Sequence, residues 1–327
     1  MDNLKFKYNK FYLNFLYNFL MGVFTSFSLP PYNYWFINFF TLSIIFIIFY
    51  KNLDLSFKTT ILLGYSFGFG YFLSSLYWIP FSLSYDENFK FLIPIAIFII
   101  PAFLSVFYAL AFGSAKLFMN SNNIVSNILI FSLALSFFEF LRGHILSGFP
   151  WNLFAYSLSD NISLIQINSV IGVYSFNLVI ITIFLAPSIL YINRNKLNLI
   201  SFSMIFLIFV FFYGFGFLKI KNFNGLENKI LSTDIKVLST NIPIDRFYSN
   251  LDDEVILKKI IDLSNVETNK NTIFIWPEAV IPNINLKDFK NEYSYLIEKS
   301  FSSNHIIILG IKDKDKAHNE KKFFNSL

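Results

Sequence analysis

The sequence predicts a chain of two parts: a multi-span α-helical membrane domain of about seven helices over residues 1–221, and a partial α/β domain over residues 222–327. The first indication is composition. Hydrophobic residues make up 55% of the 327 residues and charged residues only 14%, whereas ordinary soluble domains are about 25% charged. The second is distribution, because the long apolar runs stop near residue 222 and a soluble pattern follows.

Seven apolar runs are each long enough to cross the hydrocarbon core of a bilayer, which takes roughly 17–25 residues. They lie near residues 11–28, 34–50, 60–79, 91–113, 124–141, 168–190 and 199–218. No small-residue cleavage site follows the first run, so we expect it to be retained and not removed as a signal peptide.

The charges of the short loops predict the orientation of these runs, since Lys and Arg are in excess on the cytoplasmic side. One set of segments carries eight such residues, which are Lys5, Lys7, Lys10, Lys51, Lys58, Lys116, Arg194 and Lys196. The opposite loops carry two, Lys90 and Arg142. We therefore expect a cytoplasmic N-terminus and, after an odd number of spans, an external domain beyond residue 218.

The second part alternates between strand-like and helix-like patterns. Strands are predicted at residues 235–243, 272–276 and 305–312, and helices at 251–268 and 287–301. The last residues, FFNSL, have the composition of another strand. This alternation is typical of a sheet layered with helices.

Several kinds of chemistry are excluded by composition. The absence of Cys excludes disulfides, Cys-ligated metals and a thiol nucleophile within this sequence. The net charge of +5 is small and forms no basic patch, so we expect no nucleic-acid partner. The three His have no metal-like spacing, and no Gly-rich loop follows a strand, so no metal or cofactor is predicted.

Two features in the membrane part have structural interpretations. The stretch GYSFG at 64–68 matches the G-x-S-x-G pattern of serine hydrolases, but that pattern requires a strand-to-helix turn. Within a span, small residues instead allow close helix packing. Trp35 and Trp78 fall in external loops, as expected of an interfacial aromatic belt.

The stretch EFLRGHILSGFPWNLFAYS at 139–157 is a stronger functional candidate. Glu139 and Arg142 are three residues apart at the external end of a span, so they can pair on one helix face. Ionisable residues at membrane depth are candidates for function. The alternative is an interfacial ion pair beside a Trp anchor.

The stretch TIFIWPEAVIP at 272–282 contains one carboxylate, Glu278, after a predicted strand. Trp276 and Phe274 give it an apolar surround that would suit a proton-transferring group. Taken alone, a carboxylate after a strand is more often a structural turn residue, and the local residues leave both interpretations open.

Three segments together resemble the apolipoprotein N-acyltransferase family: LRGHILSGFPWNLFAYS in an external loop, STNIPIDRFYS at 239–249, and IFIWPEAVIP. Their order and spacing agree over nearly the whole chain. The resemblance implies a membrane domain fused to a periplasmic, nitrilase-like αββα domain in the bacterial inner membrane. It also implies transfer of an acyl chain from a phospholipid donor to the N-terminal amine of a diacylated lipoprotein acceptor.

The resemblance assigns roles to residues of this sequence. Nitrilase-like enzymes use a Glu, Lys and Cys triad in a ping-pong reaction, and Glu278 takes the place of the general base. Tyr248 stands where the family often has a Trp near the acyl-chain entrance, and Trp276, beside the base, is expected to bind substrate. Pro150, Trp151 and Tyr156 match a membrane-side loop, where we expect lipid contact.

The departure from the family pattern is the nucleophile, because the sequence contains no Cys and none of its last lysines matches the family's Lys. We therefore expect this chain to be inactive alone. It would be an incomplete copy of a longer product, one part of a split enzyme, or a remnant, and the first is favoured. The alternative functions are a membrane-anchored nitrilase-like amidase and a non-catalytic, lipid-binding scaffold.

Overall fold

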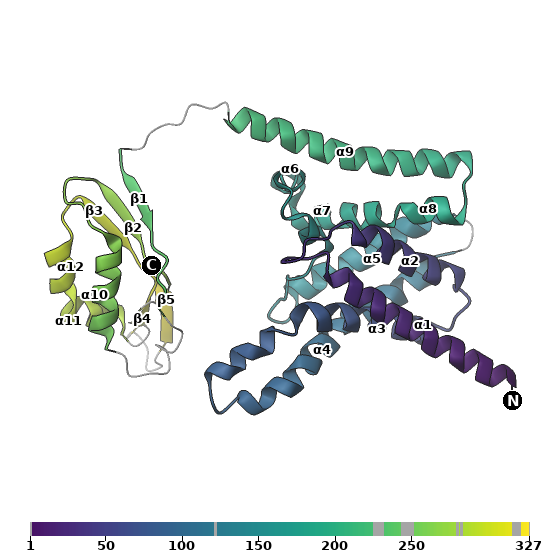
Figure 1. The fold of residues 1–327 in the computed structure, drawn as a ribbon, viewed down its shortest axis with the longest axis horizontal. Helices are drawn as coiled ribbons and strands as arrows, with labels where there is room; N and C mark the ends of the chain where they lie inside the picture. The colour runs from purple at the N-terminus through teal and green to yellow at the C-terminus, as the bar shows by residue number, and fades with distance from the viewer. Residues whose placement is uncertain are drawn as a thin grey trace. The chain divides into compact units, whose positions relative to one another are not determined.

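The computed structural model of this protein describes residues 2–120, 123–224, 232–242, 252–278, 281, 284–315 and 322–326. These residues form two compact units (Figure 1). The helical unit comprises Met1–Ser84 and Asn88–Leu226, and the α/β unit is built mainly from Glu227–Leu327.

Each predicted apolar run of the helical unit lies on helix. The α-helices are α1 Asp2–Ser26, α2 Ile37–Lys51, α3 Phe57–Leu76, α4 Ile93–Phe118, α5 Ile124–His144, α6 Ile162–Ile165, α7 Asn168–Leu185, α8 Pro187–Ile192 and α9 Lys196–Asn224. Three short 3-10 helices join them: η1 Ile79–Tyr85, η2 Lys90–Leu92 and η3 Phe154–Leu158. The run predicted at 168–190 is divided between α7 and α8 because Pro187, which has no N–H to donate, begins a new helix.

Among the described residues, four helical segments are long and apolar enough to cross a membrane: Lys90–Phe118, which joins η2 to α4, Ile124–His144, Asn168–Ile192, which joins α7 to α8, and Lys196–Phe223. Helix α2 is apolar but has only 15 residues. The expected count of seven spans stays a prediction.

Close helix packing explains the GYSFG stretch, which lies inside α3. A Cβ added at Gly64 would lie 2.6 Å from the ring of Phe112, and one added at Gly68 would lie 2.9 Å from Cβ of Tyr108. Both contacts join α3 to α4, so the predicted packing role of these glycines is confirmed. The core around them is aromatic, with Phe67 and Phe131 fully buried.

The α/β unit contains a parallel sheet in the order β1-β2-β3, formed by Asp234–Val237, Thr272–Ile275 and His305–Ile308. Its helices are α10 Asp253–Ser264, α11 Leu286–Glu292 and α12 Ser294–Ser300. An antiparallel pair follows, β4 Ile311–Asp315 and β5 Lys322–Ser326, so the strand expected in FFNSL is confirmed. The strand expected at 305–312 is wrong as a single element, because the chain leaves the parallel sheet at Leu309 and Gly310 before β4 begins.

One face of the parallel sheet is covered by helices α10 and α12 (Figure 1). Leu257 and Ile260 of α10 are fully buried in a core that includes Phe274 and Trp276. The predicted helix at 287–301 is interrupted at Tyr293, whose N–H donates to Phe289 O and closes α11. The core therefore fixes the position of β2, the strand that leads to Glu278.

Candidate functional site

The predicted pairing of Glu139 and Arg142 on α5 is confirmed. Arg142 Nη2 lies 3.9 Å from Glu139 Oε1, as expected for residues three apart on a helix. Both side chains are about 1% exposed, so the pair is a buried element of the bundle and not an ion pair at its surface. Buried charges require partners, and both residues have several.

Glu139 joins three helices through its two carboxylate oxygens. The hydroxyl of Tyr108 on α4 donates to Oε1 at 2.8 Å, and Nδ2 of Asn177 on α7 donates to Oε2 at 2.5 Å. The other amide atom of Asn177, Oδ1, accepts the backbone N–H of Ala155 at 2.9 Å. The carboxylate is thus fully engaged in structure, which leaves it no accessible oxygen for a substrate.

Arg142 holds the loop that follows α5. Its Nη1 donates to Phe149 O at 2.9 Å and to Trp151 O at 2.6 Å, and Nη2 lies 3.5 Å from Asn152 O. The guanidinium also lies over the ring of Phe72, 5.1 Å from its centroid. One fixed cation therefore gathers three carbonyl groups of a short loop.

The backbone of this loop requires such support. Leu146 and Asn152 both have φ of 59°, a left-handed conformation that is costly for Leu and that Asn adopts more readily. Gly148 has φ of 72°, and a Cβ at this position would lie 2.7 Å from Gly143 O. Glycine is therefore required in the SGFPW turn, and Arg142 contacts the left-handed residue Asn152 through its carbonyl.

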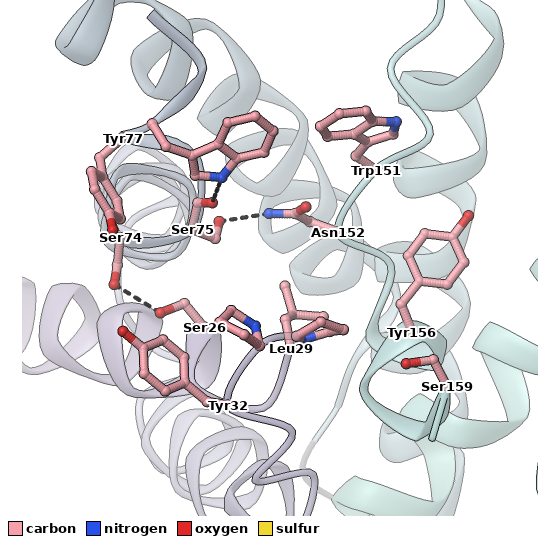
Figure 2. Close-up of a pocket in the computed structure, with 13 residues that line it drawn as sticks. Ser26, Leu29, Tyr32, Ser74, Ser75, Tyr77, Trp151, Asn152, Tyr156 and Ser159 are labelled. Atoms are coloured by element: carbon pink, nitrogen blue, oxygen red, sulfur yellow. Dashed lines mark hydrogen bonds between the residues drawn. The ribbon is translucent and has the colours of Figure 1, made fainter. Parts of the chain in front are cut away.

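The loop forms one wall of a pocket of about 460 Å³ (Figure 2). Trp151, Asn152 and Tyr156 line this wall, and Tyr77 and Ser74 line the opposite one. The full lining is Ser26, Leu29, Pro30, Pro31, Tyr32, Ser74, Ser75, Tyr77, Trp78, Trp151, Asn152, Tyr156 and Ser159. None of these residues is charged, and most of their surface is aromatic, aliphatic or hydroxyl.

Two contacts join the walls of the pocket. The rings of Trp78 and Trp151 stack with centroids 5.7 Å apart, and Asn152 Nδ2 donates to Ser75 Oγ at 2.6 Å. The Arg142 contacts to the backbone of the loop thus set the position of two pocket residues at once.

The structure brings together two of the three loop residues selected from the sequence. Trp151 and Tyr156 both line the pocket, whereas Pro150 is exposed and is not among the described lining residues. Burial raises the pKa of the Tyr156 hydroxyl above its ordinary value, with nearby Tyr174 adding to the shift, so this hydroxyl remains a hydrogen-bond donor at neutral pH.

Glu278 lies in the α/β unit, three residues after the end of β2. The side chain is exposed, and Gly310 comes so close that a Cβ there would lie 3.2 Å from Glu278 Cγ. Glu278 therefore lies at the carboxyl edge of a parallel sheet, the position at which open α/β sheets bind ligands. The apolar surround expected for it is directed elsewhere, because Phe274 and Trp276 are buried in the core.

Two more predicted substrate contacts, Trp276 and Tyr248, belong to the α/β part of the chain. Trp276 donates from Nε1 to Ser264 Oγ at 3.2 Å and packs against Phe301, and its expected role in substrate binding stays a prediction. Tyr248 lies outside the described residues. The described part of the chain contains no group of three His, Asp or Glu side chains that could hold a metal ion.

Sequence reasoning missed the polar residues that complete the helical site. Asn177 and Tyr108 lie within long apolar runs, and a polar side chain in a membrane span is itself a signal of an interhelical partner. The two serines of the pocket wall, Ser74 and Ser75, gave no comparable signal, because serine is common where helices pack.

A family model described as the apolipoprotein N-acyltransferase N-terminal domain matches residues 21–186, about half of the chain. The match contains the Glu139–Arg142 pair and all described residues that line the pocket.

Several curated proteins named apolipoprotein N-acyltransferase are similar to this chain. The protein of Rhodopseudomonas palustris is 32% identical over 231 residues, which is 67% of this chain and 42% of the relative. That of Rickettsia prowazekii is 30% identical over 79% of this chain and 50% of its own length. That of Brucella melitensis is 27% identical over 81% of this chain and 50% of its own length. The chain thus spans about half the length of the curated relatives it matches.

Proposed function

The chain belongs to the apolipoprotein N-acyltransferase family, and from that premise we propose that it forms the membrane part and the catalytic-base segment of such an enzyme. The reaction moves a fatty acyl chain from a phospholipid to the N-terminal amine of a diacylated lipoprotein. The observation that carries this proposal is the family match over residues 21–186, which contains the pocket and its supporting ion pair.

The proposed route has two steps. A thiolate attacks the ester carbonyl of the phospholipid, which forms a thioester and releases a lysophospholipid. The lipoprotein amine then attacks the thioester, so that an amide forms and the thiol is released. Glu278 accepts the thiol proton in the first step and passes it to the departing lysophospholipid oxygen, and in the second step it accepts the amine proton and returns it to the departing thiolate. The sequence contains no Cys, so in this proposal the thiol comes from a residue outside these 327, and the oxyanion-stabilising Lys is proposed to lie with it.

For the α/β unit we propose a nitrilase-like αββα sandwich. Support comes from the sheet face opposite α10 and α12, where the register aligns two apolar rows, Ile235, Ile273 and Ile306, and Val237, Ile275 and Ile308. Val237 is 72% exposed and Ile306 58% exposed. An apolar sheet face is the side on which a second sheet would pack.

For the membrane unit we propose seven spans in the bacterial inner membrane, with a cytoplasmic N-terminus and a periplasmic α/β unit. The four long apolar helices support a membrane protein, and the lysine and arginine excess supports the orientation. Helices α1, α2 and α3 would supply the three further spans.

We assign lipid contact to Trp151 and Tyr156 in the pocket and to the neighbouring Pro150, acyl-chain contact to Tyr248, and substrate binding to Trp276. The pocket has apolar walls with hydroxyl groups and no charge, which suits an acyl chain and its ester better than a charged headgroup.

The test measures, by mass spectrometry, the acylation of a diacylated lipopeptide by a longer polypeptide that carries these residues and a Cys. Glu278→Gln keeps the shape of the side chain and removes the base, so acylation should fall by roughly 10²-fold or more. Glu298→Gln, an exposed acid on α12, is the matched control and should retain activity. Full activity of the Glu278→Gln enzyme would show that the assigned base is wrong.

The absence of Cys favours a second candidate, a non-catalytic lipid-binding scaffold. This function would be favoured if the 327-residue chain still bound lipid after Glu278→Ala, and if no longer polypeptide that contains the chain acylated the lipopeptide.

A further inference from the structure

The loops at one end of the helical unit carry an excess of positive charge. Segments 51–58, 116–120 and 193–196 contain five basic residues and one acid, Asp54. The loops at the other end, over residues 27–36, 79–92 and 145–161, reverse the balance, with one base, Lys90, and three acids, Asp86, Glu87 and Asp160. The first end is therefore the one that would attract an anionic partner.

Side-chain contacts join the basic segments to one another. The ammonium group of Lys51, at the end of α2, lies over the ring of Tyr191 on α8, 4.8 Å from its centroid. Lys116 Nζ, near the end of α4, donates to Leu53 O at 2.6 Å and so holds the α2–α3 loop. The end of α2 thus lies against α8, the helix that leads into the α8–α9 turn with Arg194 and Lys196 (Figure 1).

Four of these five basic side chains are exposed, and we call them the loop cations: Lys51, Lys58, Arg194 and Lys196. Among the described residues, no ion pair joins any of them to a carboxylate. Arg194 Nε donates to Leu190 O at 2.8 Å, which leaves the two outer nitrogens of the guanidinium for a ligand. A guanidinium presents paired donors that match the oxygens of a phosphate.

Apolar side chains lie among the loop cations. Phe57 precedes Lys58, Tyr191 contacts Lys51, and Leu197 follows Lys196; these three are 45%, 63% and 74% exposed. Cations beside exposed apolar side chains at the ends of spans suit the headgroup layer, where the charge meets phosphate and the apolar group meets the acyl region. A water-soluble acidic partner would leave the apolar side chains uncovered, so the arrangement favours a lipid.

The loop cations form two groups, and this indicates the kind of headgroup. Lys51 and Lys58 flank the α2–α3 loop, and Arg194 and Lys196 lie in the α8–α9 turn. The contact of Lys51 with Tyr191 joins the two groups. We propose that this end of the bundle binds an anionic lipid whose headgroup carries two linked phosphates, one for each group of cations. The binding does not depend on acyl transfer or on Glu278, so it can fail or succeed independently of the proposed function.

The test is native mass spectrometry of the detergent-solubilised 327-residue chain titrated with cardiolipin, phosphatidylglycerol or phosphatidylethanolamine. Cardiolipin has two phosphates and should bind at least about fivefold more tightly than phosphatidylglycerol, since one basic residue near an anionic headgroup contributes about that factor. Raising the salt concentration should weaken the binding, because the interacting charges are exposed.

The variant pair separates these cations from cations in general. Lys51→Gln with Arg194→Gln removes one cation from each group and should weaken cardiolipin binding roughly 25-fold. The matched control is Lys219→Gln with Lys221→Gln, which removes two exposed lysines at the other end of α9 and should leave binding unchanged. Lys51→Arg retains the charge and should also retain the affinity, and thermal melts will verify that each variant folds.

Three results would overturn the proposal. The first is equal binding of cardiolipin and phosphatidylethanolamine by the unmodified chain. The second is a cardiolipin affinity that Lys51→Gln with Arg194→Gln reduces no more than the control pair does. The third is binding of a soluble acidic peptide, hexaglutamate, as tight as that of cardiolipin, which would assign the loop cations to a soluble partner.

Discussion

Replacing Arg142 with methionine should destabilise the helical unit and release the loop at 145–152. Methionine is similar in length and apolar, so the change removes the charge and the donors and leaves most of the volume. Glu139 would then be a buried carboxylate without its cation, and the carbonyl groups of Phe149 and Trp151 would lose their donor.

The magnitude follows from these contacts. Breaking a buried ion pair by removal of one partner costs about 3–5 kcal/mol. We expect the lower end, about 3 kcal/mol, because Glu139 keeps the hydrogen bonds from Tyr108 and Asn177. For a unit of this size, such a loss lowers Tm by roughly 10 °C.

The assay combines thermal melts in detergent with a spin label on the loop. The chain has no Cys, so Ser147→Cys gives a single labelling site at an exposed loop position. We expect Arg142→Met to make this label more mobile. The double variant Glu139→Gln with Arg142→Met should regain part of the stability, because no buried charge remains, but it should leave the label mobile.

The matched control is Arg194→Met, which removes an exposed arginine and should change the free energy of unfolding by less than about 0.5 kcal/mol. An Arg142→Met protein with an unchanged Tm and an immobile label would refute the view that this guanidinium holds the loop.

Two further predictions concern other parts of the fold. A Cβ at Gly216 of α9 would lie 1.8 Å from Ser163 O, whereas one at Gly214 would contact nothing within 4 Å. Gly216→Ala should therefore lower the free energy of unfolding by about 1–3 kcal/mol, as measured by thermal melts. A Tm equal to that of Gly214→Ala would contradict the close approach of α9 and α6. Burial, with Asp252 and Glu292 nearby, raises the pKa of Asp253, so ionisation destabilises the fold and the penalty grows as pH rises from the unfolded pKa through the folded one. Asp253→Asn should stabilise the α/β unit at pH 7 and not at pH 3. The measurement is urea unfolding followed by Trp276 fluorescence after the other tryptophans are replaced by phenylalanine. A stabilisation that does not depend on pH would show that it does not arise from ionisation of Asp253.

Sequence patterns predicted the positions of the helices better than their interruptions. Apolar runs placed helix at all seven expected positions because burial in lipid or in a core selects apolar residues over long stretches. The break at Pro187 was missed although a Pro within an apolar run is a local signal for it. The departure of the chain from the sheet at Gly310 was missed because it depends on where the next strand packs.

The candidate site shows the same division. Spacing alone predicted that Glu139 and Arg142 share a helix face. It gave no indication that both are buried, or that Arg142 binds the carbonyls of its own following loop, because those partners are backbone atoms without a sequence pattern.

The sequence by itself determined that this is a protein with long apolar helices and an α/β part, and it identified the segments through which the family is recognised. Local periodicity and composition are sufficient for that, since they reflect the environment of each segment. Only the tertiary structure decided that Trp151 and Tyr156 face one pocket, that Trp276 is a core residue, and that Asn33 meets Asp160 across 127 positions. Contacts between distant segments depend on how the helices pack, and that information is distributed over the whole core.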